Sequence, residues 1–323
     1  MNASSILWER PELQYPMPFD TVFFDVDGIL IDTLASFHAT DLATAEYVAG
    51  TIYHLDWGQH EDPNRHLLTI ADVDAFKQAG GYNNDWDMCY LLAALATARL
   101  REWHNTPLAE RSTQEWATLS REANLQGHGG RAWVDATFPQ SARLDYDIIG
   151  DIYHEYYWGA NNIRKYFGHE PRYLPNAEGF VHHERMMYSL DFFARLRQIG
   201  IQHMGMITGR VGPEVVDALE RMREYSGEQW WQVVISADTC PKPDPRALRL
   251  AINATHARGG LYIGDTADDY DLVRRYQATQ QADEPDMIAA VLVTKPEEIA
   301  LYKERGADVI VGSVEALLNL IRN

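Results

Sequence analysis

Two parts of the chain alternate short apolar runs with stretches of helical period. The first run, residues 21–25, ends in the acidic turn Asp25-Val26-Asp27-Gly28, which is typical of a buried strand that opens into a loop. The same rhythm resumes after Ser189, with apolar runs at residues 203–208, 231–236, 260–265, 289–293 and 308–312. About six strands interleaved with helices predict an α/β fold with a Rossmann-like, doubly wound parallel sheet.

The part between these two differs in its pattern. It is rich in Trp, Tyr and His and has helical period without intervening apolar runs at residues 34–49, 87–103, 111–123 and 147–168. We therefore expect residues 34–187 to form an inserted, all-helical cap domain, and residues 1–33 and 188–323 to form the core. Residues 1–20, with three prolines, predict a loosely structured lead-in.

Composition and charge narrow the classes of partner. The 323 residues include only two cysteines, Cys89 and Cys240, so neither a disulfide framework nor a cysteine zinc site is expected, which favours a cytoplasmic setting. No apolar run approaches the roughly 20 residues of a membrane helix. A net charge of −19 disfavours nucleic acid and anionic membranes as partners. It also disfavours an anionic substrate unless the site holds a cation.

Four loops that follow predicted strands carry residues suited to phosphate chemistry. In an open α/β sheet such loops meet at the carboxyl ends of the strands. Each loop alone is compatible with an ordinary turn. The four loops are residues 25–33, 208–210, 241–244 and 264–269.

In this order, the four loops resemble the four sequence motifs of the haloacid dehalogenase superfamily. The resemblance covers residues 20–33 and 188–323 and is closest to subfamily I, the phosphoglycolate phosphatase-like proteins with a helical cap inserted after the first motif. It implies a magnesium-dependent phosphatase that acts on a small phosphorylated metabolite. The implied roles are nucleophile for Asp25, general acid and base for Asp27, a phosphoryl contact for Thr208, and a bridge between nucleophile and phosphate for Lys242. The implied Mg²⁺ ligands are Asp25, the carbonyl of Asp27, and Asp265.

The residue types themselves support this chemistry. A carboxylate at a strand tip can attack phosphorus, and a second one nearby can transfer the proton. Gly28 lets the backbone approach a phosphoryl group. If the acidic residues converge, each pair of like charges at about 4 Å costs on the order of 4 kcal/mol at an effective dielectric near 20, so a divalent cation is needed. Asp269 is placed to support that metal directly or through water, or else to cap the helix that follows; Asp268 is the weaker candidate.

Other residues are candidates for contact with the substrate. In the core these are Gly28, Gly209 and Arg210, although Arg210 could instead form a structural ion pair. In the cap, residues 77–87 combine a glycine pair with dense polar groups, and Lys77, Asn84 and Asp85 are the candidates there. The alternative for this segment is a helix connection in which Asn84 or Asp85 caps the next helix.

Two further functions stay open from the sequence alone. A sugar-phosphate mutase of the same superfamily differs from a phosphatase only in what the cap provides. A catalytically idle binding or regulatory protein would keep the same fold.

Overall fold

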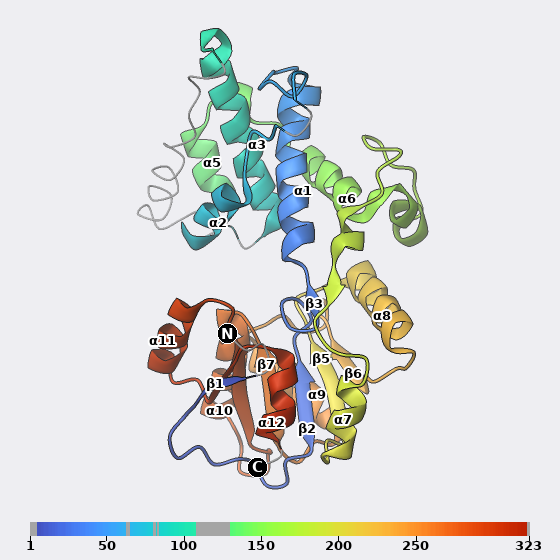
Figure 1. Cartoon of the computed structure of the whole chain (residues 1–323), viewed down its shortest axis with the longest axis vertical. Helices are drawn as coiled ribbons and strands as arrows, with labels where there is room; N and C mark the ends of the chain where they lie inside the picture. Colours follow the sequence, from blue (N-terminus) through green and yellow to red (C-terminus); the bar gives the residue numbers. More distant parts are fainter. Residues whose placement is uncertain (1–4, 63–64, 80–81, 83, 108–129, 322–323) are drawn as a thin grey trace. The chain divides into compact units, whose positions relative to one another are not determined.

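The chain divides into two compact units. The computed structural model describes residues 5–62, 65–79, 82, 84–107 and 130–321, without the side chains of residues 75, 77–79 and 297. Unit 1, the core, comprises Met1–Asp32 and Arg185–Asn323, and unit 2, the cap, comprises Thr33–Glu184 (Figure 1). The helix predicted at residues 111–123 lies outside the described residues.

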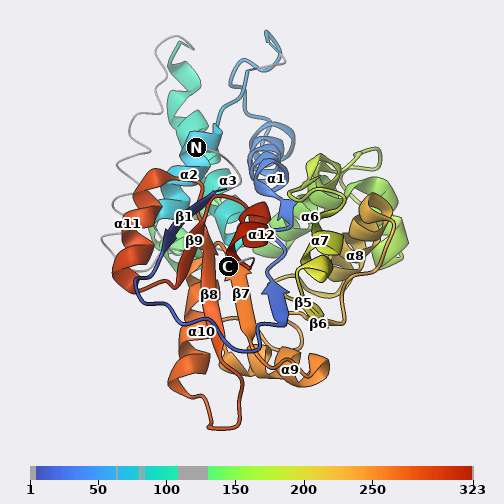
Figure 2. The ribbon, with the colours of Figure 1, turned by 60° about the horizontal axis from the view of Figure 1, so that its bottom comes forward.

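The core is built on one sheet of seven strands, in the order β1-β9-β8-β7-β2-β5-β6 (Figure 2). Every neighbouring pair is parallel except β1 with β9. Taken along the chain, the six parallel strands have the spatial order 3-2-1-4-5-6 of a doubly wound Rossmann-type sheet. The strands are β1 (Ile6–Glu9), β2 (Thr21–Phe24), β5 (His203–Ile207), β6 (Val233–Ile235), β7 (Gly260–Gly264), β8 (Met287–Leu292) and β9 (Val309–Val311).

Helices cover both faces of this sheet because its central strands are apolar on both sides. Phe24 of β2 packs in the cluster that includes α7, α8 and α12, whereas its neighbour Phe23 packs with α9, α10 and α11. The α/β fold class predicted from the sequence is therefore confirmed. The helices are α7 (Phe192–Gln198), α8 (Gly212–Ser226), α9 (Pro245–Thr255), α10 (Ala267–Ala278), α11 (Pro296–Arg305) and α12 (Leu317–Leu320).

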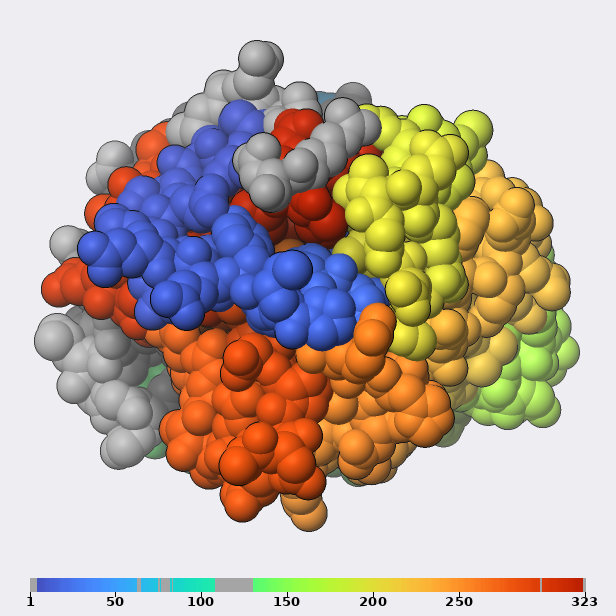
Figure 3. Space-filling model, turned by 90° about the horizontal axis from the view of Figure 1, so that it is seen from below, coloured from blue at the N-terminus to red at the C-terminus, as the bar shows by residue number. Residues whose placement is uncertain are grey.

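The N-terminal segment corrects one expectation. Residues 6–9 are not a loose lead-in but the antiparallel edge strand β1, paired with β9. Arg10 extends this attachment, because its side chain meets the buried carboxylate of Asp308 at 3.0 Å. Figure 3 shows the segment, in blue, lying beside orange and yellow segments of the same unit. Four residues between polar and proline-containing stretches are too short for a period-two signal, so the pairing depends on tertiary contacts.

The core also contains a short two-stranded ladder, formed by the residues just before and just after the cap in the sequence. β3 (Ile31–Asp32) pairs antiparallel with β4 (Arg185–Met186). The backbone N–H of Met187 also donates to the carbonyl of Leu30. The chain therefore leaves the core and returns to it at adjacent positions.

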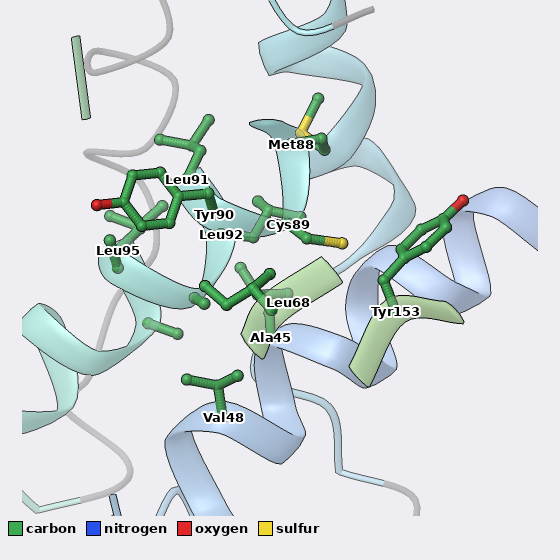
Figure 4. Packing of buried hydrophobic residues seen from close by; sticks show 14 of the residues in the cluster. Ala45, Val48, Leu68, Met88, Cys89, Tyr90, Leu91, Leu92, Leu95 and Tyr153 are labelled. Atoms are coloured by element: carbon green, nitrogen blue, oxygen red, sulfur yellow. The ribbon is translucent and has the colours of Figure 1, made fainter. Parts of the chain in front are cut away.

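The described residues of the cap form helices and connecting loops, with no strand among them. Its main helices are α1 (Leu34–Tyr47), α2 (Ile70–Ala79), α3 (Asp85–Glu102), α5 (Arg131–Thr137) and α6 (Tyr146–Asn162). Figure 4 shows side chains of α1, α3 and α6 gathered into one apolar cluster. Tyr153, Tyr157 and Trp158 are almost fully buried in it, so aromatic side chains form much of the core face of α6.

A buried carboxylate organises the end of the cap. Glu155 on α6 accepts hydrogen bonds from the backbone N–H groups of Arg172, Tyr173 and Leu174, at 2.5, 2.8 and 2.6 Å. These contacts fix the segment that follows the helix.

Among the described residues, no helix is long and apolar enough to span a membrane.

Candidate active site

The four predicted loops meet at the carboxyl ends of β2, β5, β6 and β7. The strand order reverses between β2 and β7, which lie side by side. Ligands of open α/β sheets bind at such a reversal. Asp25 follows β2 and Asp265 follows β7, so their backbones flank this point. The sheet topology thus explains why residues far apart in the sequence share one site.

Asp25 is held as a buried carboxylate at the tip of β2. Its side chain is about 5% exposed, and its backbone N–H donates to the carbonyl of Ile263. Oδ1 accepts from the backbone N–H of Val26 at 2.8 Å and lies 2.8 Å from Nζ of Lys242. Among the described residues no donor reaches Oδ2, so this oxygen is left for a ligand.

Lys242 lies between two carboxylates. Its Nζ is 2.8 Å from Asp25 and 2.6 Å from Oδ1 of Asp269. Burial alone would lower the pKa of Lys242, but the two carboxylates outweigh it and raise the pKa above its ordinary value. The ammonium group is therefore a fixed positive charge beside Asp25.

Asp269 is saturated with donors. Tyr262 and Lys242 donate to Oδ1, each at 2.6 Å, and the backbone N–H and hydroxyl of Thr266 donate to Oδ2 at 3.0 and 2.6 Å. Burial opposes ionisation, but Lys242 and these hydrogen bonds lower the pKa of Asp269. Its carboxylate completes the capping box of α10, which is the alternative role considered for it. Asp268 is exposed.

Gly28 brings the first loop against Asp265. It has a φ of 71°, and a Cβ at this position would lie 2.1 Å from Oδ2 of Asp265. Only glycine fits both the backbone angle and this close approach. Burial, and next the charge of Asp269, raise the pKa of Asp265 to about 7. Its buried Oδ1 has no hydrogen-bond partner among the described residues.

Asp27 and Arg210 form an ion pair within the site. Both Nε and Nη2 of Arg210 donate to Oδ1 of Asp27, at 2.9 and 2.7 Å. Thr208, at the tip of β5, is buried, and its Oγ1 accepts from the backbone N–H of Arg210 at 3.1 Å. The Thr208 hydroxyl proton therefore remains available to an acceptor. Gly209 is exposed, and a Cβ there would meet nothing within 4 Å.

The oxygens of Asp25 and Asp265 that have no donor among the described residues are suited to a divalent cation, whereas both oxygens of the nearby Asp269 already accept hydrogen bonds. One oxygen each from Asp25, Asp265 and Asp269 lie within 4.8 Å of one another. Burial, followed by the charge of Asp269, also raises the pKa of Asp25 well above its ordinary range. Like charges and a buried oxygen without a donor are the surroundings that a hard cation with oxygen ligands would stabilise.

The cap candidates lie in the other unit. Asn84 is the N-cap of α3, where its Oδ1 accepts from the backbone N–H groups of Trp86 and Asp87. Asp85 accepts from the hydroxyl of Tyr153 at 3.3 Å. The contacts of Asn84 are the ones expected from the helix-capping alternative. The side chain of Lys77 and residues 80, 81 and 83 lie outside the described part of the chain.

The parallel sheet, the helical unit inserted after its first parallel strand and the carboxylates at the strand reversal form the arrangement that the resemblance to the haloacid dehalogenase superfamily led us to expect. No protein-family model and no curated sequence matches the chain. Among solved structures, the chain is similar to phosphatase Tt82 from Thermococcus thioreducens, at 21% identity and a TM-score of 0.61, covering 94% of this chain and 99% of that one.

Two other solved structures are also similar. A structural-genomics target matches at 16% identity and a TM-score of 0.62, again over 94% of this chain and 99% of that one. A HAD-superfamily hydrolase of subfamily IA from Geobacter sulfurreducens matches at 14% identity and a TM-score of 0.40, over 94% and 96%. The first two likenesses confirm the fold expected from the sequence motifs.

Two contacts of the site could not be established from the sequence alone. Tyr262, inside β7, donates to Asp269, and the guanidinium of Arg210 reaches Asp27 across 183 positions. The tyrosine lies in an apolar strand pattern, where it is indistinguishable from a core residue. The Arg210 contact was one of two alternatives, and only the packing of two loops could decide between them.

Proposed function

We propose that the protein is a phosphatase that hydrolyses a small phosphomonoester through a phosphorylated Asp25. The observation that carries the proposal is the buried Asp25 carboxylate, with Oδ1 held by Lys242 and Val26 and with Oδ2 free of donors among the described residues. An oriented carboxylate whose lone pair is not engaged can act as a nucleophile toward phosphorus.

In the first half of the proposed reaction, Oδ2 of Asp25 attacks phosphorus. The bond between phosphorus and the leaving oxygen breaks, and Asp27 donates a proton to that oxygen. In the second half, Asp27 takes a proton from water, and the water oxygen attacks the same phosphorus. The bond to Asp25 breaks, so inorganic phosphate and the original carboxylate are restored.

Other residues stabilise the charge on the phosphoryl oxygens. The Thr208 hydroxyl, which accepts from Arg210, keeps its own proton for a phosphoryl oxygen, and Lys242 supplies a positive charge beside Asp25. Gly28 and Gly209 present backbone close to the substrate, whereas Asn84, Asp85 and Lys77 remain proposed contacts from the cap. The substrate itself is proposed to be a small phosphorylated metabolite.

Asp25, Asp265 and the carbonyl of Asp27 would hold Mg²⁺, with Asp269 supporting the site through Lys242 or through water. Such an ion would neutralise equatorial phosphoryl oxygens and the clustered carboxylates. The strongly negative chain also needs a local positive charge to accept an anionic substrate.

The proposal is tested by phosphate release from an aryl phosphate, with and without Mg²⁺, by the full chain and by Asp25→Asn. The expected result is magnesium-dependent release that the substitution abolishes. Unchanged release by Asp25→Asn would reject the mechanism. Phosphate moving between two hydroxyls of a sugar, without release to water, would indicate a mutase. No turnover on a panel of phosphorylated sugars, sugar acids and amino alcohols would favour a binding protein.

A further inference from the structure

Arg210 and Asp27 differ in how accessible they are. The Arg210 side chain is 3% exposed, whereas the Asp27 side chain is 29% exposed. Asp27 is therefore the member of the pair that an incoming molecule can reach. Both donated bonds go to Oδ1, and among the described residues no donor reaches Oδ2 of Asp27.

The backbone around Arg210 is fixed from two sides. Its N–H donates to Thr208, and its carbonyl accepts from the N–H of Ala237, in the loop after β6, at 3.2 Å. The N–H of Gly212 donates to Asp238 of that same loop at 2.8 Å. Since the loop after β5 is tied to the loop after β6, the guanidinium projects from a rigid support.

The support of Asp27 is weaker. Asp27 lies in the turn between β2 and β3, where it forms a single parallel bridge with Ile31 and precedes Gly28, whose φ is positive. The only side-chain hydrogen bonds of its carboxylate among the described residues come from Arg210. The orientation of the carboxylate therefore depends on the guanidinium.

We infer that Arg210 is a positioning residue for the reaction: it fixes Oδ1 of Asp27 and so presents Oδ2 as the oxygen that gives and takes the proton. The inference rests on the proposed function. Arg210 does not transfer the proton itself, because a guanidinium stays protonated in proteins. Two donors on one oxygen restrict the rotation of the carboxylate, which one flexible ammonium would not do.

The kinetic expectation follows from this role. Arg210→Ala should lower kcat for an aryl phosphate by about 10- to 100-fold, because misplacing an acid–base group by about 1 Å has that effect on the rate. KM should change by less than about twofold, because a positioning residue does not contact the substrate. Arg210→Lys should restore only part of kcat, and guanidinium ion added to Arg210→Ala should restore part of it as well. Arg249→Ala is the control.

Arg249 suits the control because it also forms an ion pair, with Glu284 at 2.6 Å, and because its hydrogen-bond partners Glu284 and Thr279 lie outside the four loops. Its loss should leave kcat and KM unchanged within about twofold while lowering stability by an amount typical of a partly buried pair. Equal effects of the Arg210 and Arg249 substitutions on kcat would contradict the inference.

A double-mutant cycle separates positioning from substrate contact. In an Asp27→Asn background, Arg210→Ala should have little further effect on kcat, since the residue through which it acts is already changed. If Arg210 instead contacts the substrate, its substitution should raise KM about tenfold in either background, a typical loss for a charge-assisted contact. That second result would overturn the inference while leaving the phosphatase proposal intact.

A crystal structure of Arg210→Ala provides a readout that does not depend on turnover. The expected result is an unchanged fold with the Asp27 carboxylate rotated or spread over more than one orientation. An Asp27 side chain that keeps its place without the guanidinium would overturn the inference even if the protein hydrolyses no phosphoester. Failure of the phosphatase proposal is recognised separately, from Asp25→Asn retaining full activity.

Discussion

Replacing Gly28 with alanine tests whether the close approach of the first loop to Asp265 matters for function. The added Cβ would lie 2.1 Å from Oδ2 and 2.7 Å from Cγ of Asp265. Ordinary contact begins at about 3.4 Å, so the carboxylate must retreat by about 1 Å or more. The atom that must move is the end of a side chain, so the fold tolerates the shift more readily than the site does.

The expected loss of stability comes mainly from the backbone. A φ of 71° costs a non-glycine residue roughly 1–2 kcal/mol. Gly227, which ends α8, is a matched control, because its φ is 73° and a Cβ there would meet nothing within 4 Å. Both alanine variants should therefore lose a similar free energy of unfolding, and only Gly28→Ala should displace Asp265.

The two variants are compared by urea unfolding and by steady-state hydrolysis of an aryl phosphate over a Mg²⁺ titration. Gly28→Ala should lose about 100-fold in kcat/KM, the effect expected from a 1 Å misplacement in a site, and should require more Mg²⁺. Gly227→Ala should keep its activity. Activity of Gly28→Ala within about threefold of the native chain, at equal folded fraction, would show that catalysis does not depend on the close approach of this loop to Asp265.

The charges of Asp265, Lys242 and Glu155 can each be tested by substitution. Without Mg²⁺, the unfolding free energy of the native chain, measured relative to Asp265→Asn, should fall by roughly 3 kcal/mol or more between pH 4 and pH 7. The reason is that burial and the charge of Asp269 raise the pKa of Asp265 from 3.8 to about 7, so the folded state binds this proton more tightly than the unfolded state does. Urea unfolding at several pH values that shows no such difference would contradict this expectation. Lys242→Met should lower the unfolding free energy by about 3 kcal/mol and slow phosphate release at least 100-fold, because it leaves the buried carboxylates of Asp25 and Asp269 without their positive partner. A variant that calorimetry shows to be as stable as the native chain, and that still releases phosphate, would contradict this role of Lys242. Glu155→Ala should destabilise the chain by about 3 kcal/mol by removing the acceptor of three backbone N–H groups, and a loss below 1 kcal/mol in urea unfolding would show that water replaces it.

Much of the core could be predicted because its strands carry local signals. Each parallel strand is a short apolar run followed by a polar loop, and the position of β2 ahead of a long helical segment indicated the insertion. β1 lacked such a signal, because its four residues become a strand only through pairing with β9. Its attachment through Arg10 and Asp308 joins positions about 300 residues apart, which no local pattern records.

The site was foreseeable as a set of residues but not as a set of contacts. The parallel order of the strands brings Asp25, Lys242 and Asp265 to one edge, so the candidates could be identified from the loops. Which donor meets which oxygen depends on packing. For example, the spacing of Asp269 equally suited a direct metal ligand. In the structure its carboxylate instead accepts hydrogen bonds from Thr266, Tyr262 and Lys242.

The proposed mechanism requires that Asp25 becomes covalently phosphorylated during turnover. Its most direct test is mass spectrometry of the peptide that contains residue 25, after the chain has been mixed with an aryl phosphate and Mg²⁺ and quenched in acid. We expect one added phosphoryl group on Asp25 in both the native chain and Asp27→Asn. The phosphorylated peptide should be more abundant in Asp27→Asn, because loss of the general base slows breakdown of the intermediate. Phosphate released at the native rate, with residue 25 never modified in either chain, would contradict the proposed mechanism.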